Sequence, residues 1–145
     1  MPRLNGQDAK YLYNRLHSLR YPLREAPRAI HNMGDIAPEL ESQVIAALAN
    51  YYASQTPPKW QPKGSVEGEK IYTAGAQDIP ACVSCHGAKG EGHGAAPRLA
   101  GQHSDYLALQ LQAFAMGARV ADPMNHHVWT MTPEQMQAVA AYLGD

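Results

Sequence analysis

A chain of 145 residues, 45% of them apolar, is long enough for one ordinary domain or two very small ones and has no compositional sign of general disorder. Its formal charge of −1 excludes the strongly basic character that is typical of nucleic-acid binding. No apolar run approaches the roughly 18–20 residues that cross a bilayer, so we expect no membrane-spanning helix.

The first half of the chain predicts two amphipathic helices, KYLYNRLHSL (residues 10–19) and ESQVIAALANYY (residues 41–52). The apolar positions that recur on one face of each are Leu12, Leu16, Leu19, Val44, Ala47, Leu48 and Tyr51. Roughly 55 residues hardly bury such faces alone. We therefore expect these faces to pack against the rest of the chain, or against a second copy in a homodimer.

Basic residues are concentrated in this half. Residues 1–63 carry eight Lys and Arg against five Asp and Glu, whereas residues 64–145 carry four against eight. The basic residues expected to face outward are Lys10, Arg15, Arg20, Arg24 and Arg28. They are either ordinary solvated charges or a surface that steers an acidic protein partner.

The remaining elements continue the helical pattern. SQTPPKWQPKGS (residues 54–65) concentrates Pro, Lys and Gly and predicts a linker. DYLALQLQAF (105–114) and TPEQMQAVAAYL (132–143) predict helices, the second with Thr132 as N-cap and Gln135 completing a capping box. No strand pattern persists, so we predict an all-α fold.

Both cysteines lie in PACVSCHGAKGEGHG, as Cys82 and Cys85 followed by His86. A zinc site needs four ligands, and without a second cysteine pair it would have to recruit His93 and His103. A thioredoxin-type pair follows a strand within a βαβ unit, whereas a proline and glycines flank this one. Covalent attachment of haem c is favoured, because two thiols at this spacing add to the vinyl groups and the next histidine binds the iron.

The chain also contains an internal repeat, since PRLNGQ at residues 2–7 recurs as PRLAGQ at residues 97–102. Pairs from Pro2 and Pro97 to Arg24 and Arg119 match at a spacing of 95, and pairs from Met33 and Met124 to Tyr51 and Tyr142 match at 91. The two halves are therefore related domains. The counterpart of the cysteine motif would fall before residue 1, so we expect the first copy to lack it.

The second half resembles the class I cytochromes c of bacteria in GEKIY (68–72), the CVSCHG loop, the glycine-rich stretch, a proline, a methionine and a last helix with an aromatic residue. GAAPRLAGQ and YLALQLQAFAMGAR are most similar to the dihaem cytochrome c-four subgroup, in which two such domains follow each other. The resemblance implies that Gly68 and Tyr72 of the first helix cross the last helix at Tyr142.

We therefore expect two cytochrome c-like helical lobes, the first incomplete. Residues 1–54 are predicted to be a truncated lobe without a haem motif, 55–65 a linker, and 66–145 the haem-binding domain.

By the same resemblance, Met124 matches the family's sixth iron ligand, and a thioether ligand raises the reduction potential. His126 and His127 are competing ligands that would give a bis-histidine iron of lower potential. An open or displaceable sixth position is the third alternative.

Other positions match the surroundings of the haem in the family. The carbonyl of Pro97 is expected to accept a hydrogen bond from the proximal His86, which orients the ring. Arg98 and Trp129 are candidates to contact haem propionates, and Leu99 contributes to an apolar wall.

With both axial positions filled, the resemblance implies a carrier of single electrons and not an enzyme. It implies one covalent haem c per chain, a periplasmic location after removal of an export signal, and redox protein partners such as a donor dehydrogenase and a terminal oxidase or reductase. The alternatives are a cytochrome subunit or fragment of a larger oxidoreductase complex, and a haem protein whose sixth ligand is displaceable.

Overall fold

The computed structural model describes residues 1–21, 33, 35–62 and 64–145; the expected basic residues Arg24 and Arg28 lie outside these ranges. The described helices are α1 (Ala9–Ser18), the 3-10 helix η2 (Ala37–Glu39), α3 (Ser42–Ala53), α4 (Val66–Ala74), α5 (Val83–His86), α6 (Ser104–Ala115), α7 (Met124–Val128) and α8 (Pro133–Leu143). Apart from isolated bridges, these residues form no β-strand. The predicted all-α fold is confirmed.

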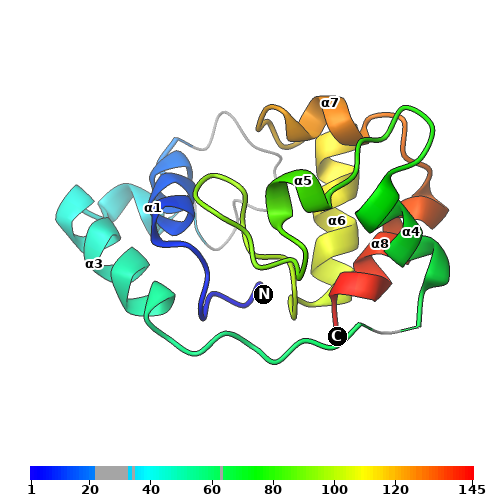
Figure 1. Cartoon of the computed structure of the whole chain (residues 1–145). Helices are drawn as coiled ribbons and strands as arrows, with labels where there is room; N and C mark the ends of the chain where they lie inside the picture. Colours follow the sequence, from blue (N-terminus) through cyan, green and yellow to red (C-terminus); the bar gives the residue numbers. More distant parts are fainter. Residues whose placement is uncertain (22–32, 34, 63) are drawn as a thin grey trace.

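The helices form two groups, which Figure 1 shows side by side. In one group α1 packs on α3; in the other, α4 and α6 both pack on α8, α7 packs on α6, and α5 contacts α4. The segment between α3 and α4 runs beneath both groups in Figure 1. No helix in the described part of the chain is long and apolar enough to cross a bilayer.

The two groups repeat one helix pair. Helix α1 precedes α6 by 95 residues, and α3 precedes α8 by 91, at the spacings of the sequence repeat. The Gly6 N–H donates to the Tyr52 carbonyl over 2.9 Å, and at the equivalent place the Gly101 N–H donates to the Leu143 carbonyl over 2.9 Å. The repeat therefore extends to the backbone hydrogen bonds that join each helix pair.

Helix α8 begins as the sequence predicts. The Thr132 hydroxyl accepts from the Gln135 N–H at 3.3 Å, and the Gln135 side chain accepts from the Thr132 N–H at 2.9 Å. This capping box satisfies two backbone donors of the first turn. The helix then buries one face, on which Tyr142 meets Tyr72 of α4 with ring centroids 5.7 Å apart.

Helix α4 crosses α8 in direct backbone contact at Gly68. A Cβ atom at this position would collide with the carbonyl of Ala138 in α8. Only a residue without a side chain allows the two helices to come this close. The crossing implied by the family resemblance, with Gly68 and Tyr72 against α8, is therefore confirmed.

We expect Gly68→Ala to lower the free energy of unfolding by about 1–3 kcal/mol, although alanine favours helices, because the opposing carbonyl belongs to the backbone of α8 and cannot rotate away. Chemical denaturation measures this loss. Lys70→Ala, on the exposed side of the same helix, is the control and should stay within about 0.5 kcal/mol of the wild type. Equal loss in both variants, or none in Gly68→Ala, would contradict the close crossing.

The predicted apolar face of α3 is only partly covered within one chain, which corrects the expectation that the rest of the chain covers it; cover by a second copy of the chain stays a prediction. Val44 is 43% exposed and Tyr51 is 59% exposed, whereas Ile45 on the neighbouring face is fully buried. The second half of the internal repeat gives the reason. There, α4 covers Tyr142, which is the counterpart of Tyr51. Among the described helices, only α1 packs extensively on α3.

The two copies of the repeated motif hold each other by reciprocal hydrogen bonds. Gln102 accepts from the Arg3 N–H at 2.8 Å and donates to the Arg3 carbonyl at 3.0 Å. Gln7 accepts from the Arg98 N–H at 2.7 Å and donates to the Arg98 carbonyl at 2.9 Å. Each glutamine is 7% exposed. The contact therefore has approximate two-fold symmetry within one chain.

The segment expected to be a linker packs against both copies. Pro57 lies against Gly6 and Pro58 against Gly101, and both glycines have a left-handed backbone, with φ of 66° and 76°. Further along, the Trp60 indole N–H donates to the Tyr142 carbonyl at 3.2 Å. Residues 57–60 therefore lie on the two copies and are not a free tether.

Candidate haem site

The cysteine motif forms one short helix. Cys82 is the N-cap residue of α5, and its carbonyl accepts the His86 N–H at 3.0 Å. Cys85 is exposed, Cys82 is half-buried, and neither forms a disulfide. Burial raises the pKa of the Cys82 thiol. A single helical turn therefore carries two free thiols and an imidazole.

The ring of His86 is buried and held by one hydrogen bond. It is 5% exposed, and its Nδ1 lies 2.8 Å from the carbonyl oxygen of Pro97. Because a carbonyl can only accept, the proton is on Nδ1, and Nε2 keeps its lone pair. Burial lowers the pKa of His86 and outweighs the opposing effect of the bond to Pro97. A neutral ring with a free Nε2 is the form that binds a metal ion.

The glycine-rich loop brings Pro97 to His86. The Gly92 N–H donates to the His86 carbonyl at 2.8 Å, and Gly92 has a left-handed backbone with φ of 71°. A Cβ atom at Gly92 would collide with the peptide group that joins Pro97 and Arg98. The close return of the loop to α5 therefore requires glycine at this position. The contact between His86 and Pro97 expected from the resemblance is confirmed.

Met124 is the first residue of α7 and packs against the main hydrophobic core. Cys82 and Leu99 pack against the same core, which includes Leu107. The expected sixth ligand, the first cysteine and the apolar wall therefore border one apolar cluster. An apolar, weakly hydrated surrounding raises the reduction potential of a bound iron.

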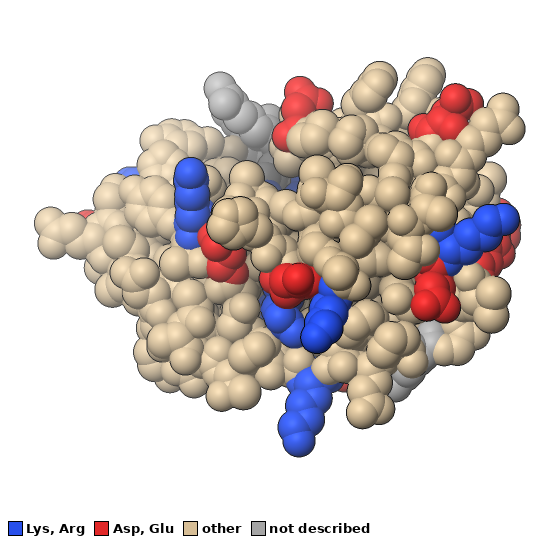
Figure 2. Space-filling view, viewed as in Figure 1, with Lys and Arg blue, Asp and Glu red and all other residues tan. Residues whose placement is uncertain are grey.

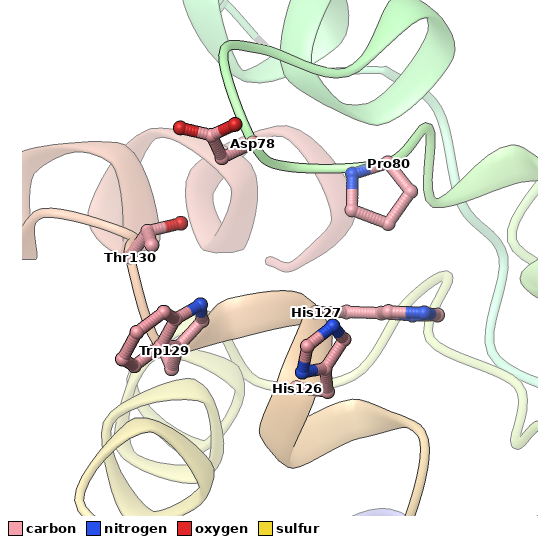
Figure 3. Close-up of a pocket in the computed structure, with 6 residues that line it drawn as sticks. All are labelled: Asp78, Pro80, His126, His127, Trp129 and Thr130. Atoms are coloured by element: carbon pink, nitrogen blue, oxygen red, sulfur yellow. The ribbon is translucent and has the colours of Figure 1, made fainter.

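His126 and His127 lie elsewhere, in a surface cleft of about 460 Å³ beside α7 (Figure 3). Pro80 faces the His127 ring from the loop that precedes Cys82, and Trp129 lines the same cleft. Trp129 is 67% exposed, so it is not a buried core aromatic. The cleft opens beside the cysteine motif.

Arg98 carries an unsatisfied buried donor. Its backbone N–H and carbonyl are both bonded to Gln7, but its side-chain Nε is buried and has no hydrogen-bond partner among the described residues. Buried guanidinium donors in proteins are normally paired with acceptors, most strongly with carboxylates or phosphates. The side chain therefore provides a place for an anionic group.

Two residues near the site were not identified from the sequence in their observed roles. The Tyr72 hydroxyl donates to the carbonyl of Gly87 at 2.5 Å, directly after His86, and burial raises the pKa of Tyr72. Gln7 reaches Arg98 from the other copy of the repeat. The match of Gln7 to Gln102 was visible in the repeat, but only the fold brings the two copies together.

A family model described as cytochrome c matches residues 65–145. The chain belongs to the cytochrome c family.

Relatives agree over almost the whole chain of this cytochrome. Cytochrome c-552 of Acidithiobacillus ferridurans is 39% identical over 149 residues, which cover 99% of this chain and 65% of that protein. The thiosulfate dehydrogenase electron acceptor of Stutzerimonas stutzeri is 36% identical over 155 residues, with coverages of 99% and 70%. The structure of cytochrome c4 from Acidithiobacillus ferrooxidans has a TM-score of 0.91 at 39% identity, covering 98% of this chain and 87% of that one. These matches confirm the resemblance to the c4 subgroup.

Membership of the family implies covalently bound haem c, and the donor set of this cytochrome fits that group. Two free thiols lie one turn apart at α5, the neutral imidazole keeps the lone pair of Nε2, and the buried Nε of Arg98 has no hydrogen-bond partner in the described part of the chain. The chain spans 65% of the length of the c-552 that it matches.

Proposed function

We propose that this cytochrome carries single electrons between redox protein partners through one covalent haem c per chain. The observation that carries the proposal is the arrangement of α5, where two free thiols adjoin a buried neutral imidazole whose Nδ1 is fixed by Pro97. When bound, haem c supplies a one-electron ferric/ferrous couple. The presence of both cysteines in a single motif supports one haem per chain.

Each residue of the site has a defined task in this proposal. Cys82 and Cys85 would attach the group, and His86 and Met124 would bind its iron. If these two residues bind the iron, they would leave no position on it for a substrate, which favours a carrier over an enzyme.

The surrounding residues position and shield the group. Pro97 fixes the ring plane of His86 through the bond to Nδ1. Arg98 would donate from its buried Nε to a propionate, and Leu99 would exclude water as part of the apolar wall. Trp129, which lines the cleft beside α7, would contact a propionate.

The proposed setting is the periplasm, with a dehydrogenase as electron donor and a terminal oxidase or reductase as acceptor. The name of one relative, thiosulfate dehydrogenase electron acceptor, favours a dehydrogenase as donor. On the face shown in Figure 2, cations and anions are interspersed and most of the surface carries neither. Docking on that face would therefore rest on uncharged surface and depend weakly on salt.

A second candidate is a cytochrome subunit that stays bound to a larger oxidoreductase, or to a second copy of this chain. The exposed apolar face of α3, which includes Val44 and Tyr51, favours it, because exposed apolar residues on one helix face are typical of contact surfaces. The molar mass of the purified protein, measured by light scattering, separates the candidates. A carrier should have the mass of the single chain, and a subunit should have the mass of a larger assembly.

The proposal is tested by the haem content of the purified protein. A haemochrome assay and intact mass are expected to give one haem per chain, with the mass of the chain raised by one haem group. A redox titration followed by the visible spectrum should fit a one-electron couple. A chain at its unmodified mass, or with two haems, would overturn the proposal.

A further inference from the structure

The peptide group between Pro97 and Arg98 is hydrogen-bonded at both of its ends. Its carbonyl oxygen, on Pro97, accepts from Nδ1 of His86 at 2.8 Å. Its N–H, on Arg98, donates to Oε1 of Gln7 at 2.7 Å. A side chain of the first copy is therefore linked to the histidine of the cysteine motif through one amide.

The loop that contains this amide is held from the first copy at a second point. Asp8 caps α1, where its Oδ1 accepts from the Tyr11 N–H at 3.0 Å. The other oxygen, Oδ2, accepts from the Gly94 N–H at 3.2 Å. The residues at the start of α1 therefore accept hydrogen bonds from the loop at Gly94 and at Arg98, on both sides of Pro97.

We propose that Gln7 is a positioning residue that lowers the reduction potential of the haem through this amide. The inference rests on the proposed role of His86 as an iron ligand. An acceptor on the N–H of an amide polarises the group and makes its oxygen a stronger acceptor. A stronger bond to Nδ1–H makes the imidazole a better donor to iron, which favours the ferric state.

The chain supplies a matched control for this relay. Gln102 grips Arg3 by the same pair of hydrogen bonds and is as buried as Gln7. In the described part of the chain, however, no histidine is bonded to the carbonyl of Pro2, which precedes Arg3. Loss of either glutamine removes an equivalent pair of hydrogen bonds between the two copies of the repeat. Only loss of Gln7 alters the amide that holds His86.

The test compares Gln7→Leu and Gln102→Leu in the haem-loaded protein by spectroelectrochemistry. Gln7→Leu is expected to raise the ferrous-to-ferric ratio at a fixed ambient potential about threefold, which is ~28 mV at 59 mV per tenfold for one electron. The Nδ1 proton resonance of His86 should move upfield as its hydrogen bond weakens. Gln102→Leu should change neither quantity.

A third variant, Gln7→Glu, separates the relay from a general loss of packing. Its side chain keeps an oxygen acceptor for the Arg98 N–H, so the potential should return to the wild-type value or fall below it. Equal shifts in Gln7→Leu and Gln102→Leu would overturn the inference, as would an unchanged potential in Gln7→Leu with histidine ligation intact. Absence of covalent haem or of histidine ligation in the wild type would instead overturn the proposed function.

Discussion

The double variant Cys82→Ala/Cys85→Ala is expected to leave the chain without any covalent haem. Both thiols of the chain are free and lie one turn apart on α5, so no other group can form a thioether. Acid–acetone extraction should remove all haem from this variant, and its intact mass should be that of the polypeptide alone. The wild type should retain its haem under the same extraction.

Ser84→Ala is the control, since Ser84 lies between the two cysteines on the same helix and is exposed. Its hydroxyl bonds only locally, to the Ala81 carbonyl at 2.7 Å and weakly to the Cys85 sulfur. Haem content should therefore equal that of the wild type. Haem that resists extraction in the double variant would refute attachment at this motif.

Met124→Ala is expected to open the iron to carbon monoxide and to abolish the weak sulfur-to-iron charge-transfer band at the red end of the oxidised spectrum. Met124 packs on the core shared with Cys82, whereas both histidines line the cleft. Removing the thioether should also lower the reduction potential, because thioether ligation raises it.

Met33→Ala provides the comparison, since Met33 is the counterpart of Met124 in the first copy and is half-buried. Its spectrum and its resistance to carbon monoxide should match the wild type. If His126 or His127 is the ligand, the wild type will lack the charge-transfer band and Met124→Ala will not admit carbon monoxide. A band that persists in Met124→Ala would point to a different methionine.

Features that depend on residues close in the chain could be predicted from the sequence. The start of α8 at Thr132 follows from a capping box within four residues, and the attachment motif at α5 spans five. The all-α fold follows from helical periodicity in each segment. The crossing of α4 and α8 could be predicted because the family resemblance implied a long-range contact between Gly68 and the last helix.

Features that depend on how the two copies meet could not be predicted. The bonds between Gln7 and Arg98 join residues 91 positions apart, and no periodicity encodes such a pairing. The composition of the segment around Pro57 indicated a linker but not its contacts, in which Pro57 lies against Gly6 and Pro58 against Gly101. The apolar stripe of α3 looks like that of α8, but burial depends on what covers it.

The reciprocal bonds of Gln7 and Gln102 bear on the ancestry of this chain. A contact in which each side offers the same residues to the other is the contact of a two-fold homodimer. A single ancestral unit carrying the PRLxGQ motif could thus have formed the same reciprocal contact with a second copy of itself. Gene duplication would then have had to add only a connection, and the segment between α3 and α4 includes two prolines that lie against a glycine of each motif. Once the copies were fused, each motif became free to change without the other, and the two already differ at Asn5 and Ala100.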